Sequence, residues 1–389
     1  MMIGIVGAPN KGKSTIFAAL TMQDVAIADY PFTTIKPNLG VTYASRECVE
    51  KELGVKCKPR NGLCKNGSRQ IPVNVVDIAG LVPGASTGKG MGNQFLNDLS
   101  AADVLIQVID ASGKTDIHGN PSASSDPSEE VRMLLEEMAL WLSGILSRHM
   151  PALSKKKDGV QALRDVLSSF NASEQQIRAA LKASSLPDLS ISWDNDATTM
   201  FSREFLKLNK HVIVAANKLD MCPQGTTDTI RRKLSGYTVV GCSGAIELAL
   251  RKAAKSGAIN YLSGSNTVEI KGSVSGEQEK ALDYMSEYIK KNSGTGIQEL
   301  VNEAVFEVAG KIVAYPVENE NKYTDHSGNV LPDALLLDKG STTMDLARVI
   351  HTDIADHMLY AIDARTKGRL GKDHTLKDND VVKIVSAAR

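Results

Sequence analysis

Short apolar runs alternate with helical patterns along most of the chain. The runs cover residues 2–7, 71–77, 104–110, 211–216 and 239–245. The run at 104–110 is almost continuously apolar, which is typical of a strand buried on both faces of a parallel sheet. The alternation therefore predicts the α/β fold class, with a mostly parallel sheet.

A long helical stretch interrupts this alternation between residues 118 and 206. Asp126, Pro127 and Glu129 form an N-cap, a first-turn proline and a capping-box partner, and Ser173 with Gln176 forms a second cap. We interpret the stretch as a helical insertion whose apolar stripes form its own core.

The pattern changes again near residue 311 and predicts a small α+β module. Strands are expected at 311–317, within 329–338 and at 381–385, with a helix at 343–350. The predicted domains are the first part of the α/β domain (1–117), the helical insertion (118–206), the second part with C-terminal helices (207–310) and the C-terminal module (311–389). The stretch 365–377 is dense in Arg, Lys and His, which suits RNA phosphates or a solvated loop.

Bulk composition excludes some classes of protein. The 389 residues are 42% hydrophobic and carry no net charge, so a strongly basic nucleic-acid binder is not indicated, although a local basic patch is compatible with this balance. No run approaches about 18 consecutive apolar residues, so we expect no transmembrane helix, and because an apolar strand is predicted at the N-terminus we expect no signal peptide. We expect a cytoplasmic protein with neither a membrane nor DNA as a partner.

The cysteines fit a reducing compartment. Cys48, Cys57 and Cys64 fall within one short stretch of the five-cysteine chain. They form no C-x-x-C pair and have no evident fourth ligand nearby, so ordinary buried or half-buried thiols are expected rather than zinc.

The sharpest motif follows the first strand at once. Residues 7–14 read Gly-Ala-Pro-Asn-Lys-Gly-Lys-Ser, a phosphate-binding G-x-x-x-x-G-K-S loop that leads into a helix. Its backbone N–H groups would cradle phosphates, Lys13 would reach the β- and γ-phosphates, and the Ser14 hydroxyl would bind Mg²⁺. The residues predicted to bind nucleotide here are Ala8, Pro9, Asn10, Lys11, Gly12, Lys13, Ser14 and Thr15.

Two further segments have the order expected of nucleotide switches. Thr34, or alternatively Thr33, lies in a loop where a threonine could close on Mg²⁺ and the γ-phosphate. Asp77 ends a strand and would hold Mg²⁺ through water, while the Gly80 amide would meet the γ-phosphate. Leu81 follows, and its apolar side chain cannot position water. The predicted catalytic residues are Lys13, Thr34 and Gly80.

Two loops near the end of the α/β pattern predict which nucleotide base is bound. Asp220 of Asn217-Lys218-Leu219-Asp220 would accept hydrogen bonds from guanine N1–H and its 2-amino group, whereas adenine would leave that carboxylate unpaired. Asn217 would bond N7 and tether the phosphate loop, and the Lys218 stem would pack on the base. The loop Ser243-Gly244-Ala245 would read guanine O6 through a backbone amide. Its glycine replaces the usual alanine, so a looser loop is expected. A small-molecule kinase has no use for such a guanine-reading loop.

These motifs resemble those of Obg-type GTPases of the YchF-like branch in their archaeal form. The resemblance rests on residues 30–40, 77–85 and 88–96, and residues 328–333 and 376–382 resemble a TGS β-grasp domain. It implies a slow GTPase that cycles with the translation machinery, with the ribosome or RNA as the partner of the TGS domain. Family members also keep an apolar residue at the position of Leu81.

The chain departs from part of that family. Many bacterial and eukaryotic YchF-type proteins have a degraded guanine loop and prefer ATP, whereas the loop at 217–220 is intact and predicts GTP. The resemblance also makes Asn10 a candidate ligand for a potassium ion beside the phosphates. Two functions remain open: a GTP-hydrolysing switch acting with ribosomes or RNA in translation or ribosome assembly, and an RNA-binding module that hydrolysis only resets.

Overall fold

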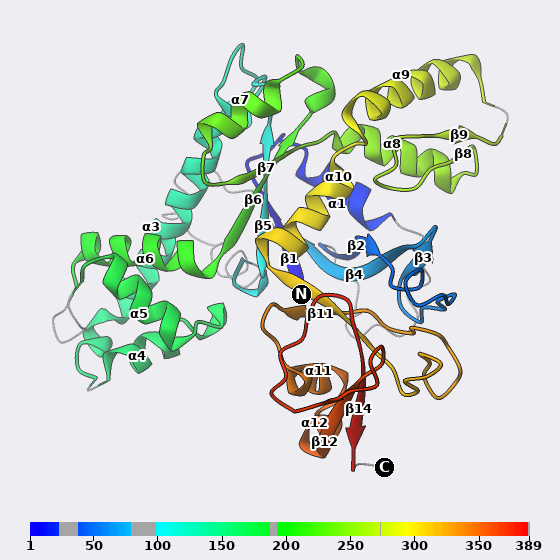
Figure 1. The fold of residues 1–389 in the computed structure, drawn as a ribbon. Helices are drawn as coiled ribbons and strands as arrows, with labels where there is room; N and C mark the ends of the chain where they lie inside the picture. The colour runs from blue at the N-terminus through cyan, green and yellow to red at the C-terminus, as the bar shows by residue number, and fades with distance from the viewer. Residues whose placement is uncertain (23–37, 79–98, 157, 187–192, 273, 388–389) are drawn as a thin grey trace.

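The structure is a computed structural model that describes residues 1–22, 38–78, 99–156, 158–186, 193–272 and 274–387. Its centre is a seven-stranded sheet with the order β2-β4-β1-β5-β6-β7, in which β3 pairs with β4 (Figure 1). The strands are β1 (Met2–Val6), β2 (Leu39–Glu47), β3 (Leu63–Lys65), β4 (Ser68–Asp77), β5 (Val104–Asp110), β6 (His211–Asn217) and β7 (Thr238–Gly241).

The sheet is mostly parallel, as predicted. β1 pairs in parallel with β4 and β5, and the parallel order continues through β6 to β7. The antiparallel part comprises β2 and β3, which both pair with β4. Asn66-Gly67 is a dipeptide typical of a two-residue hairpin turn, and both residues have positive φ where they join β3 to β4. The polar stretch 44–70, which the sequence predicts to be irregular apart from that turn, is shorter in the structure, because β2 continues to Glu47 and β4 starts at Ser68.

Helices cover both faces of the sheet, which explains why its central strands are apolar throughout. On one face, Ile3 and Ile5 pack with Ile16 of α1 (Lys13–Thr21) and Leu300 of α10 (Ile297–Asn302). On the other face, Leu105 packs with α3 (Pro127–Leu153) and α6 (Asn195–Asn209). The remaining helices of this part are α7 (Thr226–Lys233), α8 (Gly244–Lys255) and α9 (Gly276–Asn292), with a hairpin of β8 (Ile259–Asn260) and β9 (Glu269–Ile270) and a π-helical turn, Glu303–Val308.

The stretch predicted as a helical insertion consists of α3, α4 (Gly159–Val166), the 3₁₀ turn Ser168–Phe170, α5 (Glu174–Ala183) and α6. Ser173 and Gln176 form the predicted capping box. Asp126 caps α3 by accepting from the Ser128 amide, so the predicted reciprocal pair with Glu129 is replaced by a simple cap. The apolar stripes do not form a separate core, because one buried cluster joins them to the sheet.

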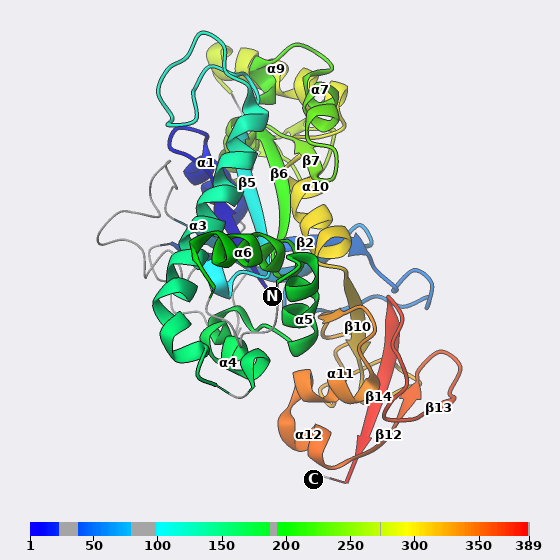
Figure 2. The same cartoon turned by 90° about the vertical axis from the view of Figure 1, so that its left-hand side faces the viewer.

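The C-terminal module has a five-stranded sheet with the order β11-β10-β14-β12-β13 (Figure 2). Its elements are β10 (Lys311–Pro316), β11 (Leu335–Asp338), α11 (Thr343–Ile350), α12 (Thr352–Asp356), β12 (Met358–Asp363), β13 (Arg369–Leu370) and β14 (Asp380–Ser386). The sequence predicted β10, β11, α11 and β14 and missed β12, β13 and α12. Tyr315 and Val381 share a buried cluster with Cys48 and Val49, so the module docks on the β2–β4 edge of the main sheet.

Candidate nucleotide site

The phosphate loop crosses from the end of β1 to the start of α1 in a shape that requires glycine. Gly12 has a φ of +93°, and a Cβ at this position would lie 2.3 Å from Nδ2 of Asn217. Gly7 has a φ of +146°, and a Cβ there would lie 2.5 Å from the carbonyl oxygen of Val108. Both glycines therefore let the loop approach the neighbouring strands closely enough to curl around a phosphate.

Lys13, Ser14 and Asp77 come together at one end of the loop. The Ser14 hydroxyl donates to Oδ2 of Asp77 over 3.3 Å, and the Lys13 ammonium donates to the Ala8 carbonyl over 3.1 Å. Burial lowers the pKa of Lys13, against the attraction of Asp77, and burial raises the pKa of Asp77. The buried Oδ1 of Asp77 has no hydrogen-bond partner among the described residues. A hydroxyl, a carboxylate and an unpaired buried oxygen together fit a hydrated Mg²⁺.

Asn217 joins the phosphate loop to the loop at 243–245. Its Nδ2 donates to the Lys11 carbonyl over 2.9 Å, and its Oδ1 accepts from the Gly244 amide over 3.0 Å. A Cβ on Gly244 would lie only 2.8 Å from Cγ1 of Ile16. The glycine therefore permits a close approach to Ile16 that a Cβ would obstruct, and the looser loop expected from the sequence stays a prediction.

Asp220 presents an unsatisfied acceptor in the same region. Its Oδ1 is buried and has no hydrogen-bond partner among the described residues, while its backbone carbonyl accepts from the Tyr284 hydroxyl of α9 over 3.3 Å. An unpaired buried carboxylate oxygen is costly, so it favours a ligand that brings N–H donors. Guanine has such donors at N1 and at its 2-amino group.

Lys218 connects the base loop to the phosphate loop. Its ammonium donates to the Asn10 carbonyl over 2.8 Å and pairs with Oδ2 of the fully buried Asp110 over 2.9 Å. Asp110 also accepts from the hydroxyls of Ser112 and Thr115. These contacts hold the pKa of Asp110 below its usual range although burial acts to raise it. Asn10 directs its amide to the Gly119 carbonyl over 3.0 Å.

Sequence reasoning did not predict the buried ion pair beneath the phosphate loop. The fully buried Lys11 ammonium lies 2.7 Å from Oε1 of Glu130 in α3 and also donates to the carbonyls of Thr115 and Asp116. Burial raises the pKa of Glu130 to about 7. The pair fixes the phosphate loop to α3, and it was hidden because its partners lie far apart in the sequence.

A second unpredicted network supports the loop at 243–245. Glu247 in α8 is fully buried and accepts from Arg251, Tyr261, Ser263 and Thr295. The Thr295 carbonyl accepts from the Ser243 amide over 2.9 Å. The Ser243 side chain caps α8, so Gly244 and Ala245 lie in the first turn of that helix. The Ser243 cap of α8 can be predicted from the local sequence, whereas the hydrogen-bond partners of Glu247 cannot.

Thr33, Thr34, Gly80 and Leu81 lie outside the described residues, so their predicted roles stay predictions. Within the described part, none of the helices is long and apolar enough to cross a membrane.

Loops that follow two strands of the sheet meet at a phosphate-binding loop, and an acceptor suited to guanine lies beside them. This arrangement defines the class of P-loop GTPases. Three family profiles match in order: "50S ribosome-binding GTPase" over residues 2–142, "Obg-like GTPase YGR210-like, G4 motif-containing domain" over 215–319, and "TGS domain" over 327–386. A GTP-binding protein of Methanocaldococcus jannaschii is 46% identical over the full length of both chains. One from Schizosaccharomyces pombe is 31% identical over 90% of each. The chain therefore belongs to the Obg-like, YchF-related GTP-binding proteins and carries a C-terminal TGS domain.

Solved structures agree with this assignment. The crystal structure of a GTP binding protein from Pyrococcus horikoshii covers all of both chains at 37% identity and a TM-score of 0.80. The Schizosaccharomyces pombe YchF GTPase shares the fold at 20% identity and a TM-score of 0.58. Among more partial relatives, the "Ribosome-binding ATPase YchF" of Mycoplasma genitalium is 36% identical over 40% of this chain and 40% of its own length.

Proposed function

We propose that this protein binds GTP with Mg²⁺ and hydrolyses it slowly to GDP and phosphate, as a switch that acts with ribosomes or RNA. The observation that supports GTP most strongly is the buried Oδ1 of Asp220, which has no partner within the described part of the chain and lies beside the Asn217 bridge. Adenine would place an acceptor against this oxygen, whereas guanine would place two donors there. We therefore expect GTP, although several partial relatives are named ATPases.

Different residues would bind the phosphates, the Mg²⁺ ion and the base. The backbone of residues 8–15 and the start of α1 would bind the phosphates, with Lys13 released from the Ala8 carbonyl to reach them. Ser14, Asp77 and Thr34 would hold Mg²⁺, which supplies charge neutralisation on the phosphates when bound. Asn217, Lys218 and Asp220 would bind the base, with O6 facing the Ala245 amide, because the Ser243 and Gly244 amides already donate to Thr295 and Asn217.

Catalysis would consist of positioning and charge stabilisation, with Lys13, Thr34 and the Gly80 amide at the γ-phosphate. The apolar side chain of Leu81 has no group that can orient the attacking water, so slow turnover is expected. Asn10 is a candidate potassium ligand. Equal turnover in potassium and sodium buffers would count against that role.

Binding can be tested by titrating fluorescent GTP and ATP analogues against the full chain with Mg²⁺. We expect GTP to bind at least about 100-fold more tightly, because adenine forfeits two hydrogen bonds to a charged acceptor. Equal affinity for both nucleotides would contradict the proposed base specificity.

The proposed partner rests on the TGS domain and on relatives named as ribosome-binding. Co-sedimentation with ribosomes and their subunits, with a non-hydrolysable GTP analogue, with GDP and without nucleotide, tests it. A second protein ending near Gly310 tests the need for the TGS domain. Binding specific to the GTP form would support the switch, and binding that ignores the nucleotide would favour the alternative RNA-binding module. No binding in any state would contradict ribosome association.

A further inference from the structure

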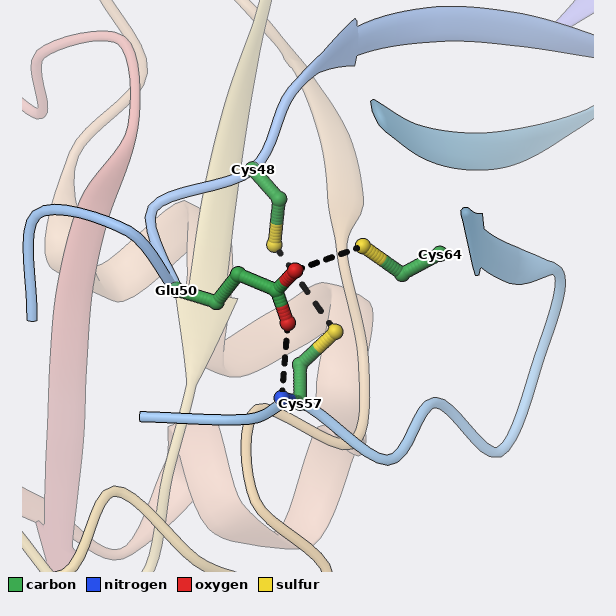
Figure 3. Close-up of side chains that lie close together, drawn as sticks. All are labelled: Cys48, Glu50, Cys57 and Cys64. Atoms are coloured by element: carbon green, nitrogen blue, oxygen red, sulfur yellow. Dashed lines mark hydrogen bonds between the residues drawn. The ribbon is translucent and has the colours of Figure 1, made fainter. Parts of the chain in front are cut away.

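Four side chains with metal-binding atoms converge in the segment that runs from the end of β2 into β3 (Figure 3). They are Cys48, Glu50, Cys57 and Cys64, and one ligand atom from each lies within 4.8 Å of the other three. The sequence provided no evident fourth ligand for the three cysteines. The structure corrects this, because Glu50 supplies a carboxylate oxygen within 4.8 Å of all three sulfurs.

The distances suit a tetrahedral ion. Sγ of Cys48 and Sγ of Cys57 lie 3.9 Å apart, and Sγ of Cys64 lies 3.6 Å from Oε1 of Glu50. A tetrahedral Zn²⁺ with ordinary bond lengths separates two sulfurs by about 3.8 Å and a sulfur from an oxygen by about 3.5 Å. A disulfide requires about 2.05 Å between sulfurs, and all five cysteines are free thiols.

The backbone around the cluster is firmly held. The Cys48 amide donates to the Gly67 carbonyl over 2.8 Å, which fixes the first thiol to the hairpin carrying Cys64. The Cys57 amide donates to Oε2 of Glu50 over 2.9 Å, which leaves Oε1 turned toward the sulfurs. Such an outer contact is what orients a carboxylate ligand.

The surroundings also suit an anionic metal site. Glu50 is 5% exposed and Cys48 is 2% exposed, so their negative charges would be held away from water. The fully buried Arg69 pairs with Cys64 in the β3–β4 ladder and donates to the carbonyls of Leu331 and Pro332. Three thiolates, one carboxylate and Zn²⁺ sum to a charge of about −2, which a buried guanidinium partly offsets.

We propose that Cys48, Glu50, Cys57 and Cys64 form a structural Zn²⁺ site that holds the segment 48–64 in the shape on which the TGS domain docks. Three thiolates select a soft or borderline ion, and a carboxylate as fourth ligand favours Zn²⁺ over Cu⁺. Four protein ligands leave no open position, which is typical of structural rather than catalytic zinc.

The link to the TGS domain rests on contacts that this segment makes. The amides of Lys58 and Arg60 donate to the carbonyls of Val330 and Pro332 over 2.8 and 2.9 Å. Arg60 also pairs with Asp333, and Glu52 pairs with Arg365 over 2.7 Å. Fixing the segment by a metal would therefore fix one side of the interface between the domains.

The test uses the full chain purified under reducing conditions without chelator. We expect about one Zn²⁺ per chain by elemental analysis, and on Co²⁺ substitution the thiolate charge-transfer and intense visible bands of tetrahedral cobalt. C57S and C64S should each weaken Zn²⁺ binding by more than the ~10–100-fold that outer-shell changes cost, and E50Q should weaken it measurably. C222S, a half-buried cysteine outside the cluster, is the matched control and should bind like the wild type.

If a variant fails to fold, the proposal is still tested on the wild type, by removing the metal with a chelator and measuring hydrogen exchange. Removing the metal should speed exchange of the Lys58 and Arg60 amides and leave the β5–β6 ladder unchanged. The proposal is overturned if the reduced protein binds no Zn²⁺ or Co²⁺ tightly, if C57S and C222S bind alike, or if Cys48 and Cys57 form a disulfide in the purified protein. Unchanged exchange on metal loss would overturn the docking role.

Discussion

In the proposed nucleotide site, single residues would decide which base is bound. The Asp220 carboxylate has one buried oxygen without a partner among the described residues, and Asn217 uses both ends of its amide to join two loops. Exchanging Asp220 should therefore change specificity, whereas exchanging Asn217 should disturb the loops themselves.

Asp220→Asn should shift preference from GTP to XTP. The new amide would donate to the 2-oxo group of xanthine, and it would meet the 2-amino group of guanine with a donor of its own. We expect GTP affinity to fall roughly 100-fold or more and XTP affinity to rise. Competition titrations with both nucleotides measure this, and Asp228→Asn on the exposed surface of α7 is the control. A variant that lost both nucleotides equally would argue against a direct contact with the base.

Glu130 should make stability depend on pH in a defined direction. Burial raises the pKa of its carboxyl to about 7, above its value of about 4.3 in an unfolded chain. The folded state therefore binds this proton more tightly than the unfolded chain does. The stability gained from the bound proton is fully present below about pH 4.5 and is lost as the pH rises through about 7. Relative to Glu130→Gln, the wild type should lose on the order of 4 kcal/mol of unfolding free energy across this window, since each pH unit between the two pKa values is worth about 1.4 kcal/mol.

Urea unfolding of both proteins between pH 4.5 and 8 provides the comparison. Glu129→Gln, at the exposed neighbouring position, should track the wild type throughout. A difference between the wild type and Glu130→Gln that stays constant over the whole range would contradict the assignment.

At the scale of elements, local motifs were predictable and long-range partners were not. The strand–loop–helix order fixed β1, the phosphate loop and α1, and Asn66-Gly67 fixed the β3–β4 hairpin, because these signals lie within a few residues of each other. Lys11 and Glu130 are separated by 119 positions, and Glu247 meets Thr295 across 48. The hydrophobic periodicity of the sequence carries no information about these contacts, since the partners come together only in the folded chain. The strand β12 was missed for a similar reason, because its pairing with β14 rather than its own pattern defines it.

The start of α8 should depend on its buried carboxylate. Glu247→Ala would leave the Arg251 guanidinium, 8% exposed, without its carboxylate, and would release Thr295 from the hub that supports Ser243. We expect a loss of about 3–5 kcal/mol of unfolding free energy and weaker GDP binding, because the loop at 243–245 loses its support. Chemical denaturation and GDP titration measure the two effects. Glu287→Ala on the exposed face of α9 should change neither.

At the scale of the whole molecule, the β2–β4 edge is where the nucleotide domain meets the TGS domain. The apolar cluster that contains Ile3 and Ile16 continues through Val49 and Cys57 to Tyr315 and Val381. Ion pairs at its rim, such as Arg46 with Asp378 over 2.6 Å, join the same two parts. The same continuous core extends from β1, next to the phosphate loop, to the TGS sheet, so any nucleotide-dependent shift at the loop would have a packed route to the C-terminal domain.

The basic stretch of the TGS domain gives the last prediction. Arg365 and Lys367 are engaged with Glu52 and with the carbonyls of Glu320 and Ala364. Arg369 lies over the Tyr360 ring at 4.0 Å and is exposed, as are Lys372 and Lys377. Within the stretch 365–377, these three exposed cations have no ion pair among the described residues, so we expect them to contact RNA phosphates if this stretch binds RNA.

Changing all three exposed cations to glutamate should weaken RNA or ribosome binding and lower the slope of log affinity against log salt by about 2, since each lost phosphate contact removes roughly 0.7. The same three charge reversals on α9, at the exposed Lys280, Lys290 and Lys291, give an identical net charge without touching the TGS domain. Salt-dependent co-sedimentation of both variants separates the two contributions. If the α9 variant loses as much binding as the TGS variant, overall charge rather than this surface governs association, and the basic stretch is a solvated loop.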